Sequence, residues 1–233
     1  MPIPRLIHFV ALGGTMPEWA DYNIGRFRAL NPGWRILVHR DDGMLLPSFR
    51  PGYDAIQGDH VWGRRSDLVR VSILGKLGGW YFDWDFLPLR RMADIVADYD
   101  LSGGFFLTQG TPDLIANGVI GTTANSPGLR AIGYELARRA ARPINRAWDG
   151  FGPRPYTDVF TAKPGLAVIG AQEMFYPLQD RADSIAAYRR LRAADYSDDA
   201  VEREFGMAPP PYALHMSMMD ELAIPEPAEA PSE

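Results

Sequence analysis

The chain has 233 residues, 46% of them hydrophobic and 12% aromatic, a composition that supports a large core and excludes a disordered protein. A formal net charge of −5 disfavours nucleic acid as a partner, because a broad non-specific grip on it requires clustered positive charge. The sequence has no cysteine, which excludes disulfides, thiolate metal sites and cysteine nucleophiles.

Targeting and domain organisation follow from the two ends of the chain. The N-terminal segment Met1–Arg5 lacks the basic region and long apolar run of a secretion signal. No segment approaches the roughly 20 continuous apolar residues of a membrane span. We therefore expect a cytoplasmic protein with a single domain, 1–223. A tail over 224–233, in which Pro, Glu and Ala alternate, is expected to be disordered.

The first 40 residues predict a strand, a helix and a strand. Leu6–Leu12 is a near-continuous apolar run that a glycine pair ends, as in a parallel strand buried on both faces. Thr15 followed by Glu18 predicts a capping box for a helix that ends near Leu30. Trp34–His39 predicts the second strand. This β-α-β order indicates an α/β fold with a layered parallel sheet.

The remaining elements continue this alternation. Met44–His60, rich in proline and glycine, is expected to be a loop, and the pairs Gly152-Pro153 and Thr157-Asp158 have ordinary turn chemistry. Arg64–Leu77 predicts a helix that a glycine pair ends, and Trp80–Phe82 predicts the next buried strand. Farther on, the patterns predict strands at 104–108, 118–121 and 167–169, and helices at 127–141 and 184–205, the last interrupted at 196–199.

Two carboxylates, Asp83 and Asp85, come directly after the predicted strand that ends at Phe82. Ligands of open α/β sheets bind at the carboxyl ends of strands. Because alternate residues of a strand share one side, we expect both aspartates to face one site while Trp84 packs elsewhere. Paired carboxylates suit Mg²⁺ or Mn²⁺ bound together with a diphosphate. Taken alone, the pair is equally compatible with a hydrated strand end.

Asp67 and Arg70 lie three residues apart on the predicted helix and project from one face. One interpretation is a surface ion pair, which contributes about 0–1 kcal/mol to stability. The other follows from the apolar character of this helix, which predicts a partly desolvated pair. In that setting Arg70 could hold a diphosphate, and Asp67 could accept hydrogen bonds from sugar hydroxyls.

A helix motif and a strand motif stand close together here: Ser66-Asp67-Leu68-Val69-Arg70 and Gly78-Gly79-Trp80-Tyr81-Phe82-Asp83-Trp84-Asp85. Their sequence and spacing resemble glycosyltransferase family 32, whose members contain a DXD sugar-binding region. The two motifs are also similar to the catalytic domains of large clostridial glucosylating toxins. The segments 3–8, 30–34 and 116–121 resemble the family as well.

The resemblance implies a GT-A fold, which is an α/β nucleotide-binding sandwich with a central mostly parallel sheet flanked by helices. It implies an enzyme of the hexosyltransferase class. That enzyme would move a sugar, with retention, from a UDP- or GDP-sugar (UDP most often) to a hydroxyl acceptor in glycan or polysaccharide synthesis. The implied cofactor is Mn²⁺ or Mg²⁺.

The family also implies roles for individual residues. The catalytic residues would be Asp83, Asp85, Arg70 and Asn117. The metal ligands would be Asp85, Asp83 and His215, although a lone histidine after an apolar stretch also fits a structural role. The donor-binding residues would be Phe9, Val10, Ala11, Ser66, Asp67, Arg70, Tyr81, Asp83 and Trp84.

Two positions depart from the family pattern. Ala11 stands where the family often has a tryptophan, so base stacking is either lost or supplied by another aromatic residue. His215 is followed by Met-Ser-Met-Met instead of the usual Ser-Trp pair. Three other functions remain open: a non-catalytic module that binds nucleotide-sugar or carbohydrate, a nucleotidyltransferase, and a nucleotide-sugar hydrolase that uses the same metal. The sequence does not identify a catalytic base.

Overall fold

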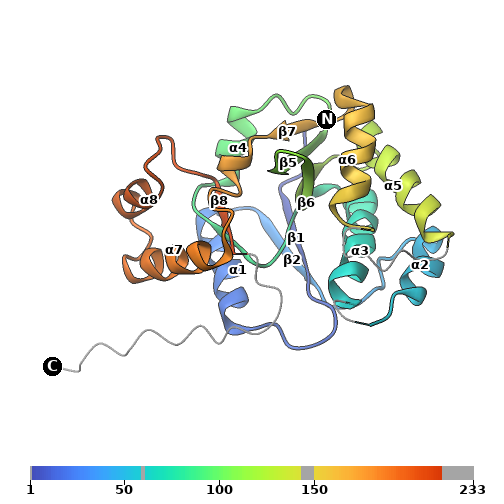
Figure 1. Ribbon diagram of the computed structural model, residues 1–233, viewed down its shortest axis with the longest axis horizontal. Coiled ribbons are helices and arrows are strands. Elements are labelled where there is room, and N and C mark those ends of the chain that lie inside the picture. The colour runs from blue at the N-terminus through green and yellow to red at the C-terminus, as the bar shows by residue number, and fades with distance from the viewer. Residues whose placement is uncertain (1, 59–60, 143–149, 217–233) are drawn as a thin grey trace.

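The computed structural model of the protein describes residues 2–58, 61–142 and 150–216. A six-stranded sheet in the order β2-β1-β3-β6-β5-β7 lies at its centre (Figure 1). These strands are β1 (Leu6–Val10), β2 (Arg35–His39), β3 (Gly79–Phe82), β5 (Phe105–Thr111), β6 (Leu114–Thr122) and β7 (Val168–Gly170). A separate two-stranded sheet consists of β4 (Phe86–Pro88) and β8 (Ala213–His215).

The central sheet is mixed. β1 pairs in parallel with β2 and β3, and β5 pairs in parallel with β7. β6 is antiparallel to both β3 and β5. Three of the five pairings are therefore parallel, which confirms the predicted α/β class with a mostly parallel sheet.

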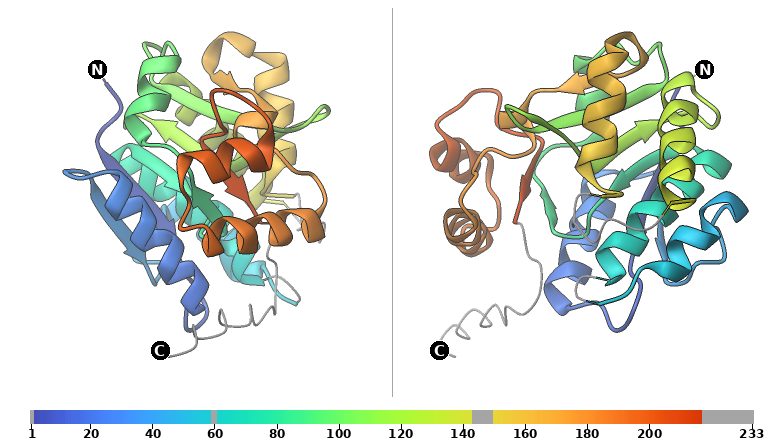
Figure 2. Two further views of the ribbon diagram at one scale, coloured as in Figure 1. Left: turned by 90° about the vertical axis from the view of Figure 1, so that its left-hand side faces the viewer. Right: turned by 45° about the vertical axis from the view of Figure 1, so that its right-hand side comes forward.

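Helices cover both faces of the sheet (Figure 2). On one face lie α2 (Arg50–Ala55), α3 (Val61–Leu77), α5 (Pro127–Ala140) and α6 (Pro153–Ala162). On the other face lie α1 (Glu18–Leu30) and α4 (Met92–Asp98). The chain then forms α7 (Arg181–Ala193) and α8 (Asp198–Phe205). Three short 3₁₀ helices span Pro47–Phe49, Pro164–Leu166 and Gln172–Met174.

The central strands are apolar on both faces because each face is covered. Trp80 and Phe82 of β3 pack in the cluster that contains α1, whereas Tyr81 between them packs in the cluster that contains α3. Phe105 and Phe106 of β5 divide in the same way. This alternation follows from the pleat of the strands and explains why the sequence shows continuous apolar runs.

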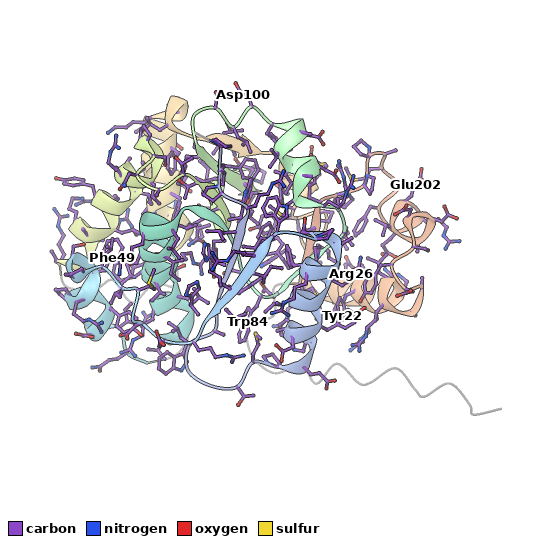
Figure 3. All side chains as sticks on the ribbon, turned by 180° about the vertical axis from the view of Figure 1, so that it is seen from behind. Tyr22, Arg26, Phe49, Trp84, Asp100 and Glu202 are labelled. Carbon is purple, nitrogen blue, oxygen red and sulfur yellow. The ribbon has the colours of Figure 1, made fainter. Side chains whose placement is uncertain are left out.

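A third hydrophobic cluster joins the two-stranded sheet to the C-terminal helices through Leu87, Leu214 and Tyr188. Helix α1 also reaches this region, because the guanidinium of Arg26 lies 3.9 Å from the centroid of the Tyr196 ring. Figure 3 labels Arg26 on α1, next to the C-terminal helices. These contacts hold the last described strand, β8, against the body of the domain.

The predicted capping box at the start of the first helix is wrong. The helix begins at Glu18 after Pro17, whose extended backbone (φ −66°, ψ 152°) precedes the first helical residue, and no side chain caps it. The physical reason is that a residue before proline is driven out of the helical region, so Met16 cannot belong to a helix that starts at Thr15.

The predicted loop over Met44–His60 is also wrong in part, because it contains a 3₁₀ turn and the helix α2. Pro47 and Pro51 lie in the first turn of these helices, where their missing N–H groups leave no intrahelical hydrogen bond unmade. Phe49 and Tyr53 are buried against α3 and α5, and this packing stabilises the short helix.

The two pairs with turn chemistry belong to helix α6: Gly152 precedes its first residue, Pro153 lies in its first turn, and Thr157-Asp158 lies inside it. The predicted strands at 104–108 and 118–121 are parts of the longer strands β5 and β6. Strand β4, helix α4 and strand β8 were not predicted. No helix within the described ranges is long and apolar enough to cross a membrane. The predicted tail over 224–233 lies outside the described residues.

His8 on β1 is fully buried between neighbouring strands. Its Nε2 atom lies 2.9 Å from the carbonyl oxygen of Gly78, and its Nδ1 atom lies 3.1 Å from Nε2 of His39. Since a carbonyl only accepts, Nε2 of His8 carries the proton and Nδ1 accepts from His39. Burial, aided by the charges of His39 and Arg35, lowers the pKa of His8 to about 4.

A histidine whose pKa falls on folding stabilises the protein above its unfolded pKa of about 6.5, and this contribution disappears as the pH falls towards 4. We expect His8→Gln, which keeps a donor for Gly78, to be less stable than the wild type at pH 7. The difference in the free energy of unfolding between the wild type and His8→Gln should be about 2 kcal/mol smaller at pH 5 than at pH 7. Urea unfolding at both pH values measures it, and an unchanged difference would contradict the buried neutral imidazole.

Candidate active site

Asp83, Asp85 and His215 form the candidate metal site. One ligand atom from each residue lies within 4.8 Å of the other two. His215 is brought there by the antiparallel pairing of β4 with β8, which places it opposite Phe86. Its Nε2 atom lies 3.4 Å from Oδ2 of Asp85. The backbone N–H of Met216 donates to the carbonyl oxygen of Asp85 at 3.0 Å and fixes this register. We call these three residues the triad.

The two aspartates share a site because of a turn, and not because of strand alternation as the sequence suggested. β3 ends at Phe82, and the N–H of Phe86 donates to the carbonyl oxygen of Asp83 at 3.2 Å. The N–H of Asp83 donates to the carbonyl oxygen of Gly118 on β6 at 2.9 Å. The turn therefore reverses the chain into β4 while both carboxylates stay at the end of β3.

Trp84, between the aspartates, packs elsewhere. Its ring centroid lies 6.2 Å from that of Trp19 on α1, and the side-chain amide of Asn23 donates to its carbonyl oxygen at 3.3 Å. Figure 3 labels Trp84 close to α1. This residue was predicted to bind the donor; its ring belongs to the packing on α1, and only its backbone lies in the turn.

Arg70 on α3 connects the helix to this turn although it is only 4% exposed. Its Nη2 atom lies 3.0 Å from Oδ1 of Asp83 and 3.3 Å from Oδ1 of Asp67, and it donates to Oγ of Ser66 at 2.9 Å. Nη1 donates to the carbonyl oxygen of Asn117 at 2.8 Å. Both acidic partners are at least partly buried, so the interpretation as a surface ion pair is wrong.

Tyr81 and Asn117 complete this network. The hydroxyl of Tyr81 donates to Oδ1 of Asp83 at 2.6 Å, and its ring centroid lies 4.3 Å from the guanidinium carbon of Arg70. The side-chain amide of Asn117 donates to Oδ1 of Asp67 at 2.8 Å. Six of the predicted site residues, from α3, β3, the turn after β3 and β6, therefore belong to one hydrogen-bonded cluster: Ser66, Asp67, Arg70, Tyr81, Asp83 and Asn117.

Burial dominates the electrostatics of the site. It raises the pKa of Asp67 to about 6, although the guanidinium of Arg70 opposes the rise. Burial also raises the pKa of Asp83, again against Arg70. Burial alone would lower the pKa of His215, but the neighbouring carboxylates of Asp85 and Asp83 bring it above its ordinary value. A metal ion at the triad would compete with protons for the same atoms.

The three donor-binding residues predicted on the first strand and just after it are buried. Phe9 packs on Phe27 of α1 with ring centroids 5.2 Å apart, and Val10 packs in the cluster of α3. Ala11 follows β1, and its backbone N–H donates to the carbonyl oxygen of His39 at 2.8 Å. The side chains of Phe9 and Val10 therefore belong to the core.

The sequence analysis missed two aromatic residues, Trp62 and Tyr176. Trp62 lies in the first turn of α3 with 43% of its surface exposed, and its indole covers Gly13, where any Cβ would clash with the ring. It was missed because the helix was predicted to begin at Arg64. Tyr176 follows β7, and its ring centroid lies 5.0 Å from that of His215. No local pattern links Tyr176 to the triad.

Comparisons with known proteins place this geometry in context. Residues 17–102 match a family model described as the glycosyltransferase sugar-binding region containing DXD motif. No curated protein is significantly similar in sequence. The solved structure of the PaToxG glycosyltransferase is 14% identical, with a TM-score of 0.54 over 90% of this chain and 80% of that one.

Two more solved structures are similar at lower scores. The ligand-free glycosyltransferase domain from the YGT toxin is 10% identical, with a TM-score of 0.49 over 72% of this chain and 80% of that one. The catalytic domain of alpha-toxin from Clostridium novyi is 10% identical, with a TM-score of 0.43 over 84% of this chain and 68% of that one.

The buried position of Arg70 generates a stability prediction. Arg70→Met should lower the free energy of unfolding by about 3–5 kcal/mol, because it leaves Asp67 and Asp83 without their buried cation. The matched control is Arg50→Met, because the Arg50–Asp42 pair is exposed and its loss should change little. Urea denaturation of both variants measures the effect, and equal losses in the two variants would contradict it.

The matched segment contains α1, α3, β3 and both aspartates of the triad, so the predicted resemblance is confirmed for these residues. At 14% identity the likeness to a solved structure speaks for the fold, and it confirms the GT-A type. Family match and fold together bear out the glycosyltransferase class that the sequence predicts. The chain therefore has a GT-A-type fold, and its residues 17–102 are similar to the glycosyltransferase sugar-binding region containing DXD motif.

Proposed function

We propose that this protein transfers a sugar from a UDP- or GDP-sugar to a hydroxyl acceptor, with retention and with the help of a divalent ion. The observation that carries the proposal is the meeting of Asp83, Asp85 and His215 beside the buried Arg70 network. This meeting occurs at the carboxyl end of β3, where ligands of such sheets bind.

The residues of the triad fit a divalent ion. Two carboxylates and one imidazole are suitable ligands, and one atom of each lies within 4.8 Å of the others. The carboxylates suit both Mg²⁺ and Mn²⁺, while the imidazole nitrogen favours Mn²⁺, since Mg²⁺ prefers oxygen ligands. When bound, the ion would supply charge neutralisation for the departing diphosphate.

Arg70 supports this site mainly by holding its carboxylates. Its guanidinium contacts Asp67 and Asp83 and also donates to the backbone of Asn117, so it fixes the wall on which the donor would lie. We propose that the sugar of the donor lies against this wall and accepts or donates hydrogen bonds there. Preorganised polar groups of this kind stabilise developing charge without reorganising during the reaction.

The proposed transfer balances without a dedicated base. The bond between the anomeric carbon and the phosphate oxygen breaks, and a bond to the acceptor oxygen forms on the same face. The acceptor proton moves to the leaving phosphate oxygen. The task left to the protein is to hold the acceptor against the anomeric carbon. A glycan acceptor and a cytoplasmic location stay predictions, as does the single domain over 1–223.

For the nucleobase we propose a contact with Trp62. The position on the first strand where stacking was expected is Ala11, which has no ring to offer. Trp62 presents a partly exposed indole over Gly13, one turn before Ser66 on the same helix. Gly13 has a φ of +85° and lies against the ring, so its missing side chain makes room for this arrangement.

The central test is the loss of one metal ligand. Asp85→Asn should lower Mn²⁺-dependent turnover of the nucleotide-sugar by about 100-fold or more, because a ligand of the charge-neutralising ion is lost. Asp100→Asn is the matched control, since this exposed aspartate lies outside the site (Figure 3). Circular dichroism checks that both variants fold.

The outcomes of this experiment separate the functions. Unchanged turnover in Asp85→Asn would overturn the proposed metal site. Donor binding by the wild type without any turnover would favour a binding module. Mass spectrometry of the products separates the other two functions. Free sugar without a glycosylated acceptor would identify a hydrolase, and an acceptor that carries a nucleotidyl group would identify a nucleotidyltransferase.

The base contact has its own test. Trp62→Ala should weaken the binding of UDP or GDP by roughly 5- to 100-fold, because base–aromatic stacking contributes about 1–3 kcal/mol. Mn²⁺ affinity measured without nucleotide should stay unchanged. Tyr134→Ala serves as the control, because Tyr134 on α5 is also an exposed aromatic residue (75%) and is not one of the residues assigned to the site. Calorimetric titration that finds equal nucleotide affinity in wild type and Trp62→Ala would refute the contact.

A further inference from the structure

Tyr176 lies beside the triad although it comes from a distant part of the chain. Its backbone N–H donates to the carbonyl oxygen of Gln172 at 2.7 Å. The preceding residue, Phe175, is fully buried, with ring centroids 5.8 Å from Phe106 and 5.3 Å from Tyr212. The buried neighbour and the backbone bond anchor Tyr176 in place.

The ring of Tyr176 packs on two residues of the site. It meets His215 edge to face at 5.0 Å and Phe86 edge to face at 5.4 Å between ring centroids. These contacts fix the direction of the phenol, because an aromatic ring held on two sides has little rotational freedom. The hydroxyl at its tip is therefore a positioned group and not a mobile one.

Gly118 on β6 shows where this hydroxyl lies. A Cβ atom built on Gly118 would be 2.8 Å from Oδ2 of Asp83 and 2.9 Å from the hydroxyl oxygen of Tyr176. The same Cβ would lie 3.1 Å from Cε2 of Phe86, so these side chains already crowd the glycine. Because both oxygen atoms approach one point so closely, they are at most about 5.7 Å apart, a span that one bridging hydroxyl group can cover with two hydrogen bonds. Gly118 lies within a strand and does not have a left-handed backbone, so its conformation does not require glycine. Glycine is needed here because the side chains of Asp83, Tyr176 and Phe86 approach so closely that any Cβ would clash with them.

The chemistry of the two oxygen atoms indicates which group could bridge them. The carboxylate of Asp83 accepts hydrogen bonds, and the phenol of Tyr176 donates one. Among the hydrogen bonds of the described residues, none joins these two groups directly. A hydroxyl group can donate to the carboxylate and accept from the phenol, whereas a phosphate oxygen would be repelled by Asp83. The pair therefore suits a sugar hydroxyl.

We propose that Tyr176 is a donor-recognition residue whose hydroxyl, together with Asp83, binds one hydroxyl of the sugar that is transferred. This inference rests on the proposed function, because it assigns a subsite within the same donor site. Asp83 links the subsite to the wall proposed for the sugar, because its Oδ1 atom contacts Arg70 while its Oδ2 atom faces Gly118 and Tyr176. A ribose hydroxyl is the competing occupant that the experiment has to separate.

Tyr176→Phe is the decisive variant, since it keeps the ring that packs on His215 and Phe86 and removes only the hydroxyl. Tyr188→Phe is the matched control, because it removes a buried tyrosine hydroxyl in the cluster of the C-terminal helices. The probes are UDP-glucose, UDP-N-acetylglucosamine and GDP-mannose, each compared with UDP or GDP alone, all with Mn²⁺ in calorimetric titrations.

We expect Tyr176→Phe to bind the donors accepted by the wild type roughly 5-fold more weakly, as the loss of one hydrogen bond predicts. UDP and GDP alone should bind as they do to the wild type, within about 2-fold.

Three results would overturn the inference: unchanged donor affinity in Tyr176→Phe, an equal loss for donor and nucleotide, or a wild type that binds nucleotides but no donor of the panel. The second of these would assign the hydroxyl to the nucleotide part of the ligand. A wild type that binds neither nucleotides nor donors in the presence of Mn²⁺ would instead overturn the proposed function itself, so the two failures are distinguishable.

Discussion

The burial of the Arg70 guanidinium is the constraint on which the rest of the site depends. A buried cation is tolerated only when acceptors surround it, and this one contacts Asp67, Asp83 and the backbone of Asn117. Those partners come from α3, from the turn after β3 and from β6. Three elements distant in sequence are therefore held in one relative position, and the carboxylates at the strand end cannot rotate independently of the helix.

The sequence predicted those parts of the fold that depend on local pattern. The strand at Leu6, the helix that leads to Gly78 and the strand before Asp83 are marked by apolar runs and glycine stops, and all three are present. The contact between Arg70 and Asp67 follows from their spacing of three residues on one helix. The sequence did not predict the turn that brings Asp83 and Asp85 together. A continued strand would also place these two aspartates on one side, so the pattern cannot distinguish a strand from a turn here.

The remaining parts of the site depend on contacts between distant segments. His215 reaches the aspartates through a strand pairing with β4, and Tyr176 reaches them through the packing of Phe175. Neither is visible in a local pattern, since each depends on where the chain returns. Local errors had a different cause. Prolines in first helical turns concealed α2 and α6, and the start of α3 was predicted three residues late, which left out Trp62.

The position of His215 on a small sheet of its own has a thermodynamic consequence. Strand β8 is not hydrogen-bonded to the six-stranded sheet and is held by β4 and by the cluster under α7 and α8. Any cation that draws on His215 and the aspartates together also favours the docked state of this C-terminal layer, by mass action. Conversely, a substitution that loosens the layer, however far from the aspartates, weakens cation affinity. If the proposed ion binds there, its binding and the docking of this layer form one coupled equilibrium.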